Sequence, residues 1–94
     1  MILEIRRGLA KRRERQITQP VFLVGANPDC DMVLGDPQFA PIHFYLLYRH
    51  GRTSFRCVDN TPDVTINGSP KRAAPVHDGD RIRTGSYEFV VRAA

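Results

Sequence analysis

Apolar and polar residues alternate over short runs along the chain, and few stretches have the 3.6-residue spacing of an amphipathic helix. The runs are rich in β-branched and aromatic residues, and clusters of Gly, Pro, Asn and Asp separate them. This pattern predicts an all-β chain. The predicted strands cover residues 1–6, 16–24, 31–34, 42–49, 52–58, 64–66, 81–84 and 87–92.

The turns between these strands are predicted from dipeptides that favour unusual backbone angles. Asn67-Gly68 is typical of a type I′ hairpin turn, in which both central residues need a positive φ. His50-Gly51 is expected to turn the chain from the strand 42–49 into the strand 52–58. Pro20 has no backbone N–H, which predicts an edge or a bulge for the strand 16–24. Strict alternation over 52–58 predicts that Phe55 and Cys57 face the core.

Length and composition indicate one small globular domain spanning residues 1–94. The chain is 41% hydrophobic and 26% charged, which excludes collagen-like and disordered classes. Short, regularly punctuated strands favour a β-sandwich or barrel over an α/β fold. Apolar runs are too short for a transmembrane segment or a secretory signal, so a cytoplasmic location is expected.

The residues capable of catalysis or metal binding form no recognised motif. The two cysteines, Cys30 and Cys57, are far apart and not in a Cys-x-x-Cys pair, so we expect free, buried thiols, with a single bridge as the alternative. The segment His77-Asp78-x-Asp80 is interpreted as a turn. No nucleophile elbow or protease signature occurs. The sequence therefore predicts a non-enzymatic protein without metal or cofactor.

Positive charge is concentrated near the N-terminus of a chain that carries 14 Lys and Arg against 10 Asp and Glu. We call this cluster the basic turn; it consists of Arg6, Arg7, Lys11, Arg12, Arg13 and Arg15. It could bind nucleic acid, anionic lipid or an acidic protein partner. The interpretation that we favour is a solvated hairpin that keeps an edge strand from pairing with other chains.

Four motifs in a fixed order resemble the forkhead-associated (FHA) domain family from about Val21 to Val91. They are V-G-x-x-x-x-C-D-x-V-L-x-D-P from Val24, a loop ending in x-x-x-H at His43, N-G at Asn67, and D-G-D-x-I-x-x-G from Asp78. The resemblance implies an FHA-type (SMAD/FHA-like) β-sandwich of about eleven short, mostly antiparallel strands. It also implies a protein-binding module without catalysis, which usually recognises phosphothreonine peptides through loops at one end. From the residues themselves, we do not expect nucleic acid to be the partner, because the strand that carries Tyr45, Tyr48 and Arg49 is also rich in core residues.

The residues that grip phosphate in this family are not retained. Ala26 stands where the family has an arginine, and Ala40 stands where it has a serine. The third motif, within 59–64, lacks its Asn-Gly-Thr triplet. Each charge-assisted hydrogen bond is worth about 1.5 to 3 kcal/mol, so losing two donors weakens phosphate binding by about a hundredfold to ten-thousandfold.

The resemblance therefore implies a loop surface that contacts a protein partner without requiring phosphothreonine. Its expected contact residues are Ala26, Asn27, Ala40, Pro41, Asn60 and Thr61. Gly25 and His43 are interpreted as residues that hold the loops in shape. The alternative is a phosphothreonine site with other contacts, in which an arginine such as Arg49 or Arg52 reaches the phosphate.

A second, more local resemblance covers Val24 to Phe44. There the Phe-Ala-Pro-Ile-His segment is similar to the cytoplasmic domain of the type III secretion inner-membrane ring protein. In that group the sandwich is a docking element for other components of the apparatus. The motifs favour a general FHA-like domain over this more specific assignment, which remains an alternative.

Overall fold

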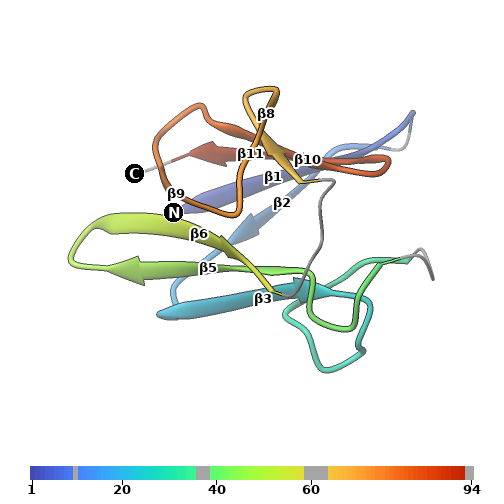
Figure 1. Ribbon diagram of the computed structural model, residues 1–94, viewed down its shortest axis with the longest axis horizontal. Coiled ribbons are helices and arrows are strands. Elements are labelled where there is room, and N and C mark those ends of the chain that lie inside the picture. Colours follow the sequence, from blue (N-terminus) through green and yellow to red (C-terminus); the bar gives the residue numbers. More distant parts are fainter. Residues whose placement is uncertain (10, 36–38, 59–63, 93–94) are drawn as a thin grey trace. The chain divides into compact units, whose positions relative to one another are not determined.

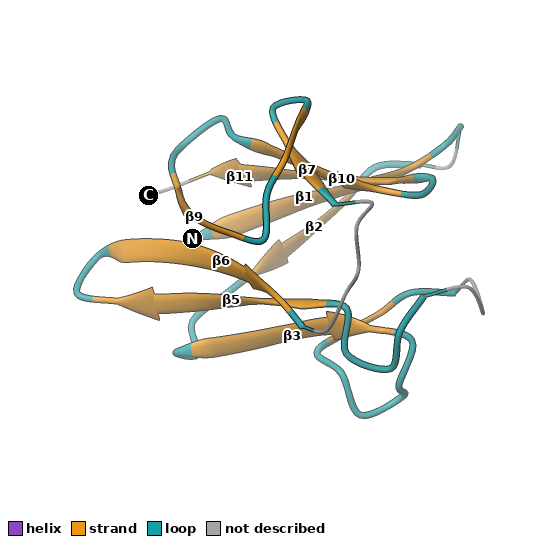
Figure 2. Ribbon diagram, in the orientation of Figure 1, coloured by secondary structure: helices purple, strands orange, loops and turns teal. Residues whose placement is uncertain are grey.

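The computed structural model describes residues 1–9, 11–35, 39–58 and 64–92, and in these residues it contains strands and no helix (Figures 1 and 2). The described part of the chain thus offers no helix that could cross a membrane. The eleven strands are β1 (Ile2–Arg7), β2 (Arg13–Gln16), β3 (Val21–Gly25), β4 (Met32–Val33), β5 (Phe44–Arg49), β6 (Arg52–Cys57), β7 (Thr65–Ile66), β8 (Ser69–Pro70), β9 (Ala73–Val76), β10 (Arg81–Thr84) and β11 (Tyr87–Arg92).

The first sheet has six strands in the order β2-β1-β11-β10-β7-β8 and lies in one compact unit of the chain. The pairs of β1 with β2 and with β11 are antiparallel. Strand alternation sends Leu3 and Phe89 to one face, where both are fully buried, while Glu4, Arg6 and Glu88 point to the other face. Hydrophobic burial therefore anchors one side of this sheet and leaves charged side chains on the other.

The second sheet has five strands in the order β4-β3-β5-β6-β9 and forms most of a second compact unit. Strand β5 pairs antiparallel with β3 and β6, whereas β3 and β4 run parallel. One face carries Phe22, Leu46 and Phe55, which are 1% exposed. Phe44 packs against Phe55 with 5.2 Å between ring centroids. This apolar face fixes the register of the strands that carry the candidate site.

Two predicted hairpin turns are confirmed. Asn67 and Gly68 have φ of 51° and 84°, and His50 and Gly51 have φ of 52° and 73°. Both central residues of each turn are left-handed, as a type I′ turn requires. Asp80 supports the first turn, because the Asn67 Nδ2 donates to its Oδ1 at 2.9 Å.

The burial pattern of the predicted strand 52–58 is confirmed as well. Phe55 and Cys57 are buried on β6 and Arg56 is exposed. Cys30 and Cys57 are both free and buried, as expected from their spacing.

The single strand predicted over residues 16–24 is wrong. Strand β2 ends at Gln16 and β3 begins at Val21. Between them, the Ile17 N–H donates to the Met1 carbonyl at 2.8 Å, and its side chain is 1% exposed. Pro20 precedes β3, where its carbonyl accepts from the Tyr48 N–H at 2.8 Å. The predicted strand is divided because β2 belongs to the six-stranded sheet and β3 to the five-stranded sheet.

Strands β8 and β9 were not predicted from the alternation pattern. Each contains a proline, Pro70 in β8 and Pro75 in β9, and each is the outermost strand of its sheet. Proline is tolerated at sheet edges because one side of an edge strand needs no donor. The pattern treats such residues as strand breakers and so misses both elements.

Candidate functional site

Two loops at one end of the five-stranded sheet are joined by main-chain hydrogen bonds. The Ala26 N–H donates to the Ala40 carbonyl and the Asn27 N–H donates to the Pro41 carbonyl, each at 3.0 Å. We call residues 25–31 and 39–43 the loop pair. It brings together four of the predicted contact residues; the other two, Asn60 and Thr61, lie outside the described residues.

Gly25 lies where no side chain fits. A Cβ atom at this position would be 2.2 Å from the Pro41 carbonyl oxygen and 2.8 Å from the Ile42 Cα. Real Cβ atoms do not approach main-chain atoms so closely, so only glycine allows this contact. The Gly25 carbonyl also accepts from the Leu34 N–H at 2.8 Å. The close approach sets the spacing between the two loops.

The Cys30 thiol joins the same contact, which the sequence did not indicate. Its Sγ donates to the Pro41 carbonyl at 3.2 Å, and its N–H donates to the Asn27 carbonyl at 3.0 Å. Burial raises the pKa of this thiol, the backbone contact with Asn27 partly opposes the shift, and the carboxylates of Asp31 and Asp29 raise it further. The thiol therefore stays protonated at neutral pH and remains a donor.

His43 is buried at the base of the loop pair, with 2% of its surface exposed. Its N–H donates to the Val24 carbonyl at 2.8 Å, and its carbonyl accepts from the Val58 N–H at 3.2 Å. The ring makes an edge contact with Phe39, with 5.1 Å between centroids. These contacts connect β3 to the residue that follows β6. Because the His43 ring is buried, a large ligand could not contact it unless the loops rearranged.

The exposed part of the loop pair is small and nearly free of hydrogen-bond donors. Pro41 and Asn27 are exposed, and Ala26 and Ala40 are partly exposed. The Asn27 Oδ1 accepts from the Asp29 N–H at 2.8 Å, which is an Asx turn. The surface therefore combines methyl and pyrrolidine groups with the Asn27 amide and the Asp29 carboxylate.

Arg49 and Arg52 lie at the opposite end of the sheet from the loop pair. Strand β5 begins at Phe44, next to His43, and ends at Arg49, which is paired with Arg52. Five residues of extended strand span about 17 Å. Neither arginine side chain can cover that distance, so a phosphate at the loop pair is out of their reach.

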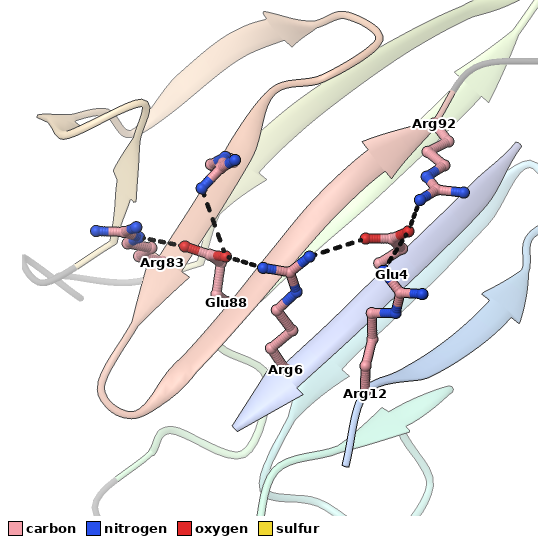
Figure 3. A network of polar contacts seen from close by, with 7 residues as sticks. Glu4, Arg6, Arg12, Arg83, Glu88 and Arg92 are labelled. Atoms are coloured by element: carbon pink, nitrogen blue, oxygen red, sulfur yellow. Dashed lines mark hydrogen bonds and ion pairs between the residues drawn. The ribbon is translucent and has the colours of Figure 1, made fainter. Parts of the chain in front are cut away.

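Part of the basic turn belongs to a charge network on the six-stranded sheet (Figure 3). The Glu4 carboxylate is 1% exposed and forms ion pairs with Arg6 at 3.6 Å, with Arg12 at 3.4 Å and with Arg92. Arg6 also reaches Glu88 at 3.7 Å, so it lies between the two carboxylates, as Figure 3 shows. Glu88 is held in turn by Arg83 at 2.6 Å and Arg81 at 4.0 Å.

The remaining residues of the basic turn lie on or next to the hairpin strands. The Arg7 guanidinium lies over the Tyr87 ring, 5.1 Å from its centroid. Lys11, Arg13 and Arg15 are exposed, the last two on the edge strand β2. Sequence reasoning did not identify Glu4 as the centre around which Arg6 and Arg12 gather. The only sequence signal for its burial is that apolar residues flank it on both sides, Leu3 and Ile5.

Metal binding finds no support in the described part of the chain, where no group of three or more His, Cys, Asp or Glu side chains could hold an ion. The ring of His77 and the carboxylate of Asp80 are neighbours within one turn, in line with the interpretation of that segment.

Solved structures with the same fold are FHA domains. An FHA domain studied for phosphothreonine-dependent interactions has a TM-score of 0.83 and 22% identity over 98% of this chain and 96% of that chain. The FHA domain of the CT664 protein from Chlamydia trachomatis has a TM-score of 0.83 and 16% identity over 95% and 92%. The N-terminal FHA domain of S. cerevisiae Rad53p, in complex with a phosphothreonine peptide, has a TM-score of 0.77 and 18% identity over 100% and 94%. The all-β, FHA-type sandwich predicted from the motifs is confirmed.

A family model gives the more specific assignment. No curated protein matches the chain. The model that matches is described as "Inner membrane component of T3SS, cytoplasmic domain", where T3SS is the type III secretion system, and the match covers residues 4–94. The local resemblance over 24–44, which the motifs favoured less than a general FHA-like domain, therefore extends over nearly the whole sequence. The chain belongs to the family of cytoplasmic domains of the type III secretion inner-membrane component.

Proposed function

We propose that residues 1–94 act as a single FHA-like docking domain in the cytoplasm, where the loop pair contacts a protein component of a secretion apparatus without requiring phosphothreonine. Family membership supports the docking role, since FHA-like domains are interaction modules. The domain contributes no catalysis and needs no cofactor in this proposal.

The observation that carries the proposal is that two main-chain donors of the loop pair already have acceptors within the loops. The Ala26 and Asn27 N–H groups donate to the Ala40 and Pro41 carbonyls, so they are not available to an anion. The side chains of Ala26 and Ala40 carry no polar atom. Phosphate binding depends on convergent N–H, hydroxyl or guanidinium donors, and the described residues at this end lack such an arrangement.

Local charge supports the same conclusion. The carboxylates of Asp29 and Asp31 are close enough to Cys30 to raise the pKa of its thiol. The same negative potential opposes a phosphothreonine dianion at the loop pair. A partner surface with apolar groups and hydrogen-bond donors suits this end of the domain better.

Titration with a phosphothreonine peptide library tests the proposal. We expect no phosphate-dependent binding to the wild-type domain, because two donors and a favourable potential are missing. Binding tighter than about 10 μM that disappears on dephosphorylation would contradict the proposal.

A gain-of-function variant serves as the positive control. Ala26→Arg combined with Ala40→Ser restores the two donor side chains of the family pattern. We expect phosphopeptide affinity to rise by about a hundredfold or more, since each restored donor contributes about 1.5 to 3 kcal/mol. This variant also tests whether the loops keep the geometry of a phosphate site.

A further inference from the structure

The five-stranded sheet has a second face whose side chains are solvent-exposed. Residues directly opposite each other on paired strands share a face. Val21 is opposite Leu47, Tyr45 is opposite Arg56, and Arg49 is opposite Arg52. These six residues lie on the side of the sheet away from Phe22, Leu46 and Phe55, and we call them the β5 face.

Apolar surface is accessible on the β5 face. Val21 is 43% exposed, Tyr45 and Leu47 are partly exposed, and the three arginines are exposed. An open hollow beside them is lined by Leu47, Arg49, His50, Arg52, Thr53, Ser54 and Pro75. Exposed apolar side chains grouped around a hollow and rimmed by charge are typical of protein-binding surfaces.

The charge of this face is not balanced within its own sheet. Strands β3, β4, β5, β6 and β9 contain no acidic residue, while β5 and β6 contain three arginines. Among the described residues, Arg49, Arg52 and Arg56 form no ion pair. By contrast, five arginines on or beside the six-stranded sheet lie around Glu4 and Glu88: Arg6, Arg12, Arg81, Arg83 and Arg92. The β5 face therefore presents uncompensated positive charge beside apolar side chains.

We propose that the β5 face docks an acidic, amphipathic segment of a protein partner. An apolar side chain of the segment fills the hollow beside Leu47, and its carboxylates pair with Arg49, Arg52 and Arg56. Tyr and Arg are the residue types enriched at the centres of protein interfaces. Charge complementarity selects an acidic partner and speeds its association.

A protein segment suits this face better than a nucleic acid. Single-stranded nucleic acids need several aromatic platforms for their bases, and the β5 face has only Tyr45. The Tyr48 side chain alternates to the other face of β5. Val21 and Leu47 are aliphatic and bury apolar side chains rather than stack with bases.

Selection from a random dodecapeptide phage library against the purified domain tests the proposal. The proposal predicts enrichment of peptides that combine Asp or Glu with Leu, Ile, Phe or Val. No enrichment, or enrichment of neutral or basic peptides, would overturn it. Single-stranded DNA oligonucleotides and anionic vesicles are titrated in parallel, and binding of either through the same arginines, tighter than that of any peptide, would also overturn it.

Variants locate the binding surface. Arg49→Glu combined with Arg52→Glu should weaken the selected peptides by at least about tenfold, since each exposed pair contributes up to about fivefold and reversal adds repulsion. Leu47→Ser should weaken them independently of salt. The milder pair Arg49→Ala with Arg52→Ala provides the same test should the reversal variant fail to fold.

The control makes the same charge change elsewhere. Lys11→Glu combined with Arg13→Glu reverses two exposed charges of the basic turn and should leave peptide affinity within about twofold. Equal weakening by both double variants would mean that net charge alone drives binding, against the proposal. Ala40→Lys at the loop pair should have no effect on these peptides, so failure of the loop-pair function and failure of this inference are distinguishable.

Discussion

The arginines of the two sheets differ in what surrounds them. On the six-stranded sheet, Arg6, Arg12 and Arg92 converge on the buried Glu4 carboxylate, and further arginines hold Glu88 (Figure 3). On the five-stranded sheet, Arg49 and Arg52 lie opposite each other with no acidic residue on any strand of that sheet. These arginines are thus paired with carboxylates in one sheet and form no ion pair among the described residues of the other.

This difference between the two sheets shows that the number of basic residues in a segment does not by itself identify a binding surface. The basic turn has the densest positive charge in the sequence, yet Arg6, Arg7 and Arg12 contact Glu4, Glu88 or Tyr87 within their own sheet. The β5 face has fewer arginines than the basic turn. What decides availability is whether a carboxylate lies within reach in the folded chain.

The largest effect is expected at Gly25, where the five-stranded sheet depends on a main-chain contact rather than on charge. Gly25→Ala forces a Cβ against the Pro41 carbonyl and should lower the free energy of unfolding by about 3 kcal/mol or more. Chemical denaturation measures the change. The control is Gly8→Ala in the turn after β1, where φ is 53° but the space around the residue is open; this change should cost about 1 kcal/mol. If the two variants lost the same free energy of unfolding, the close contact between Gly25 and the Pro41 carbonyl would not contribute to stability.

The next effect tests the centre of the charge network. Glu4→Gln leaves Arg6, Arg12 and Arg92 without their shared carboxylate and should lower the free energy of unfolding by about 2 kcal/mol. The value is below that of a fully buried pair because the three arginine side chains are about half exposed. Glu14→Gln, at a half-exposed carboxylate 4.0 Å from Arg92, should cost less than about 0.5 kcal/mol. If the Glu4 variant were as stable as the Glu14 variant, the arginines around Glu4 would contribute no more to stability than an exposed ion pair.

A third, smaller effect concerns Asp80 and appears as a pH dependence. Burial raises the pKa of Asp80, but hydrogen bonds from the His77 N–H and the Asn67 amide outweigh this and leave it below its usual value of 3.8. Because the folded pKa is depressed, the stabilisation is present above about pH 4 and is lost as pH falls through the folded pKa. Asp80→Asn should cost about 1 kcal/mol at neutral pH. Thermal unfolding measured at a series of acidic pH values checks this. As the pH falls, the melting temperature of this variant should decrease less steeply than that of the wild type.

The smallest effect compares single arginines of the two sheets directly. Arg6→Ala breaks contacts to both Glu4 and Glu88 and should lower the free energy of unfolding by about 1 kcal/mol. Arg56→Ala on the β5 face should change it by less than about 0.5 kcal/mol. Parallel denaturation curves in low and high salt check the assignment, since only the Arg6 contribution should decrease with salt. A larger loss for Arg56 than for Arg6 would reverse the comparison.

The strands with clean alternation were predictable from the sequence, and the exceptions have physical causes. β6 and β11 follow the pattern because each has one buried and one solvated face. The pattern does not predict β8 and β9, because each contains a proline and a proline usually indicates the end of a strand. The break between β2 and β3 was missed because the chain leaves the six-stranded sheet after Gln16 and joins the five-stranded sheet at Val21, a change of sheet that no local pattern encodes.

The candidate site was predictable only in part. The motif order identified Ala26 and Ala40 as members of one loop surface, and the structure brings their main chains together. The thiol of Cys30 was assigned to the core, because nothing in its neighbours indicates that it donates to the Pro41 carbonyl. Arg49 was considered for phosphate binding only because it is an arginine. The length of β5 places it at the end of the sheet opposite the loop pair.

The outermost strands of both sheets have a consequence for crowded conditions. Among the described strands, β2 has the sequence RERQ, β4 and β8 are two residues long, and β8 and β9 each contain a proline. Charge, brevity and missing N–H groups all prevent main-chain pairing between neighbouring molecules. Many copies held close together should therefore be less prone to merge into fibrils than a sandwich with long, uncharged edge strands.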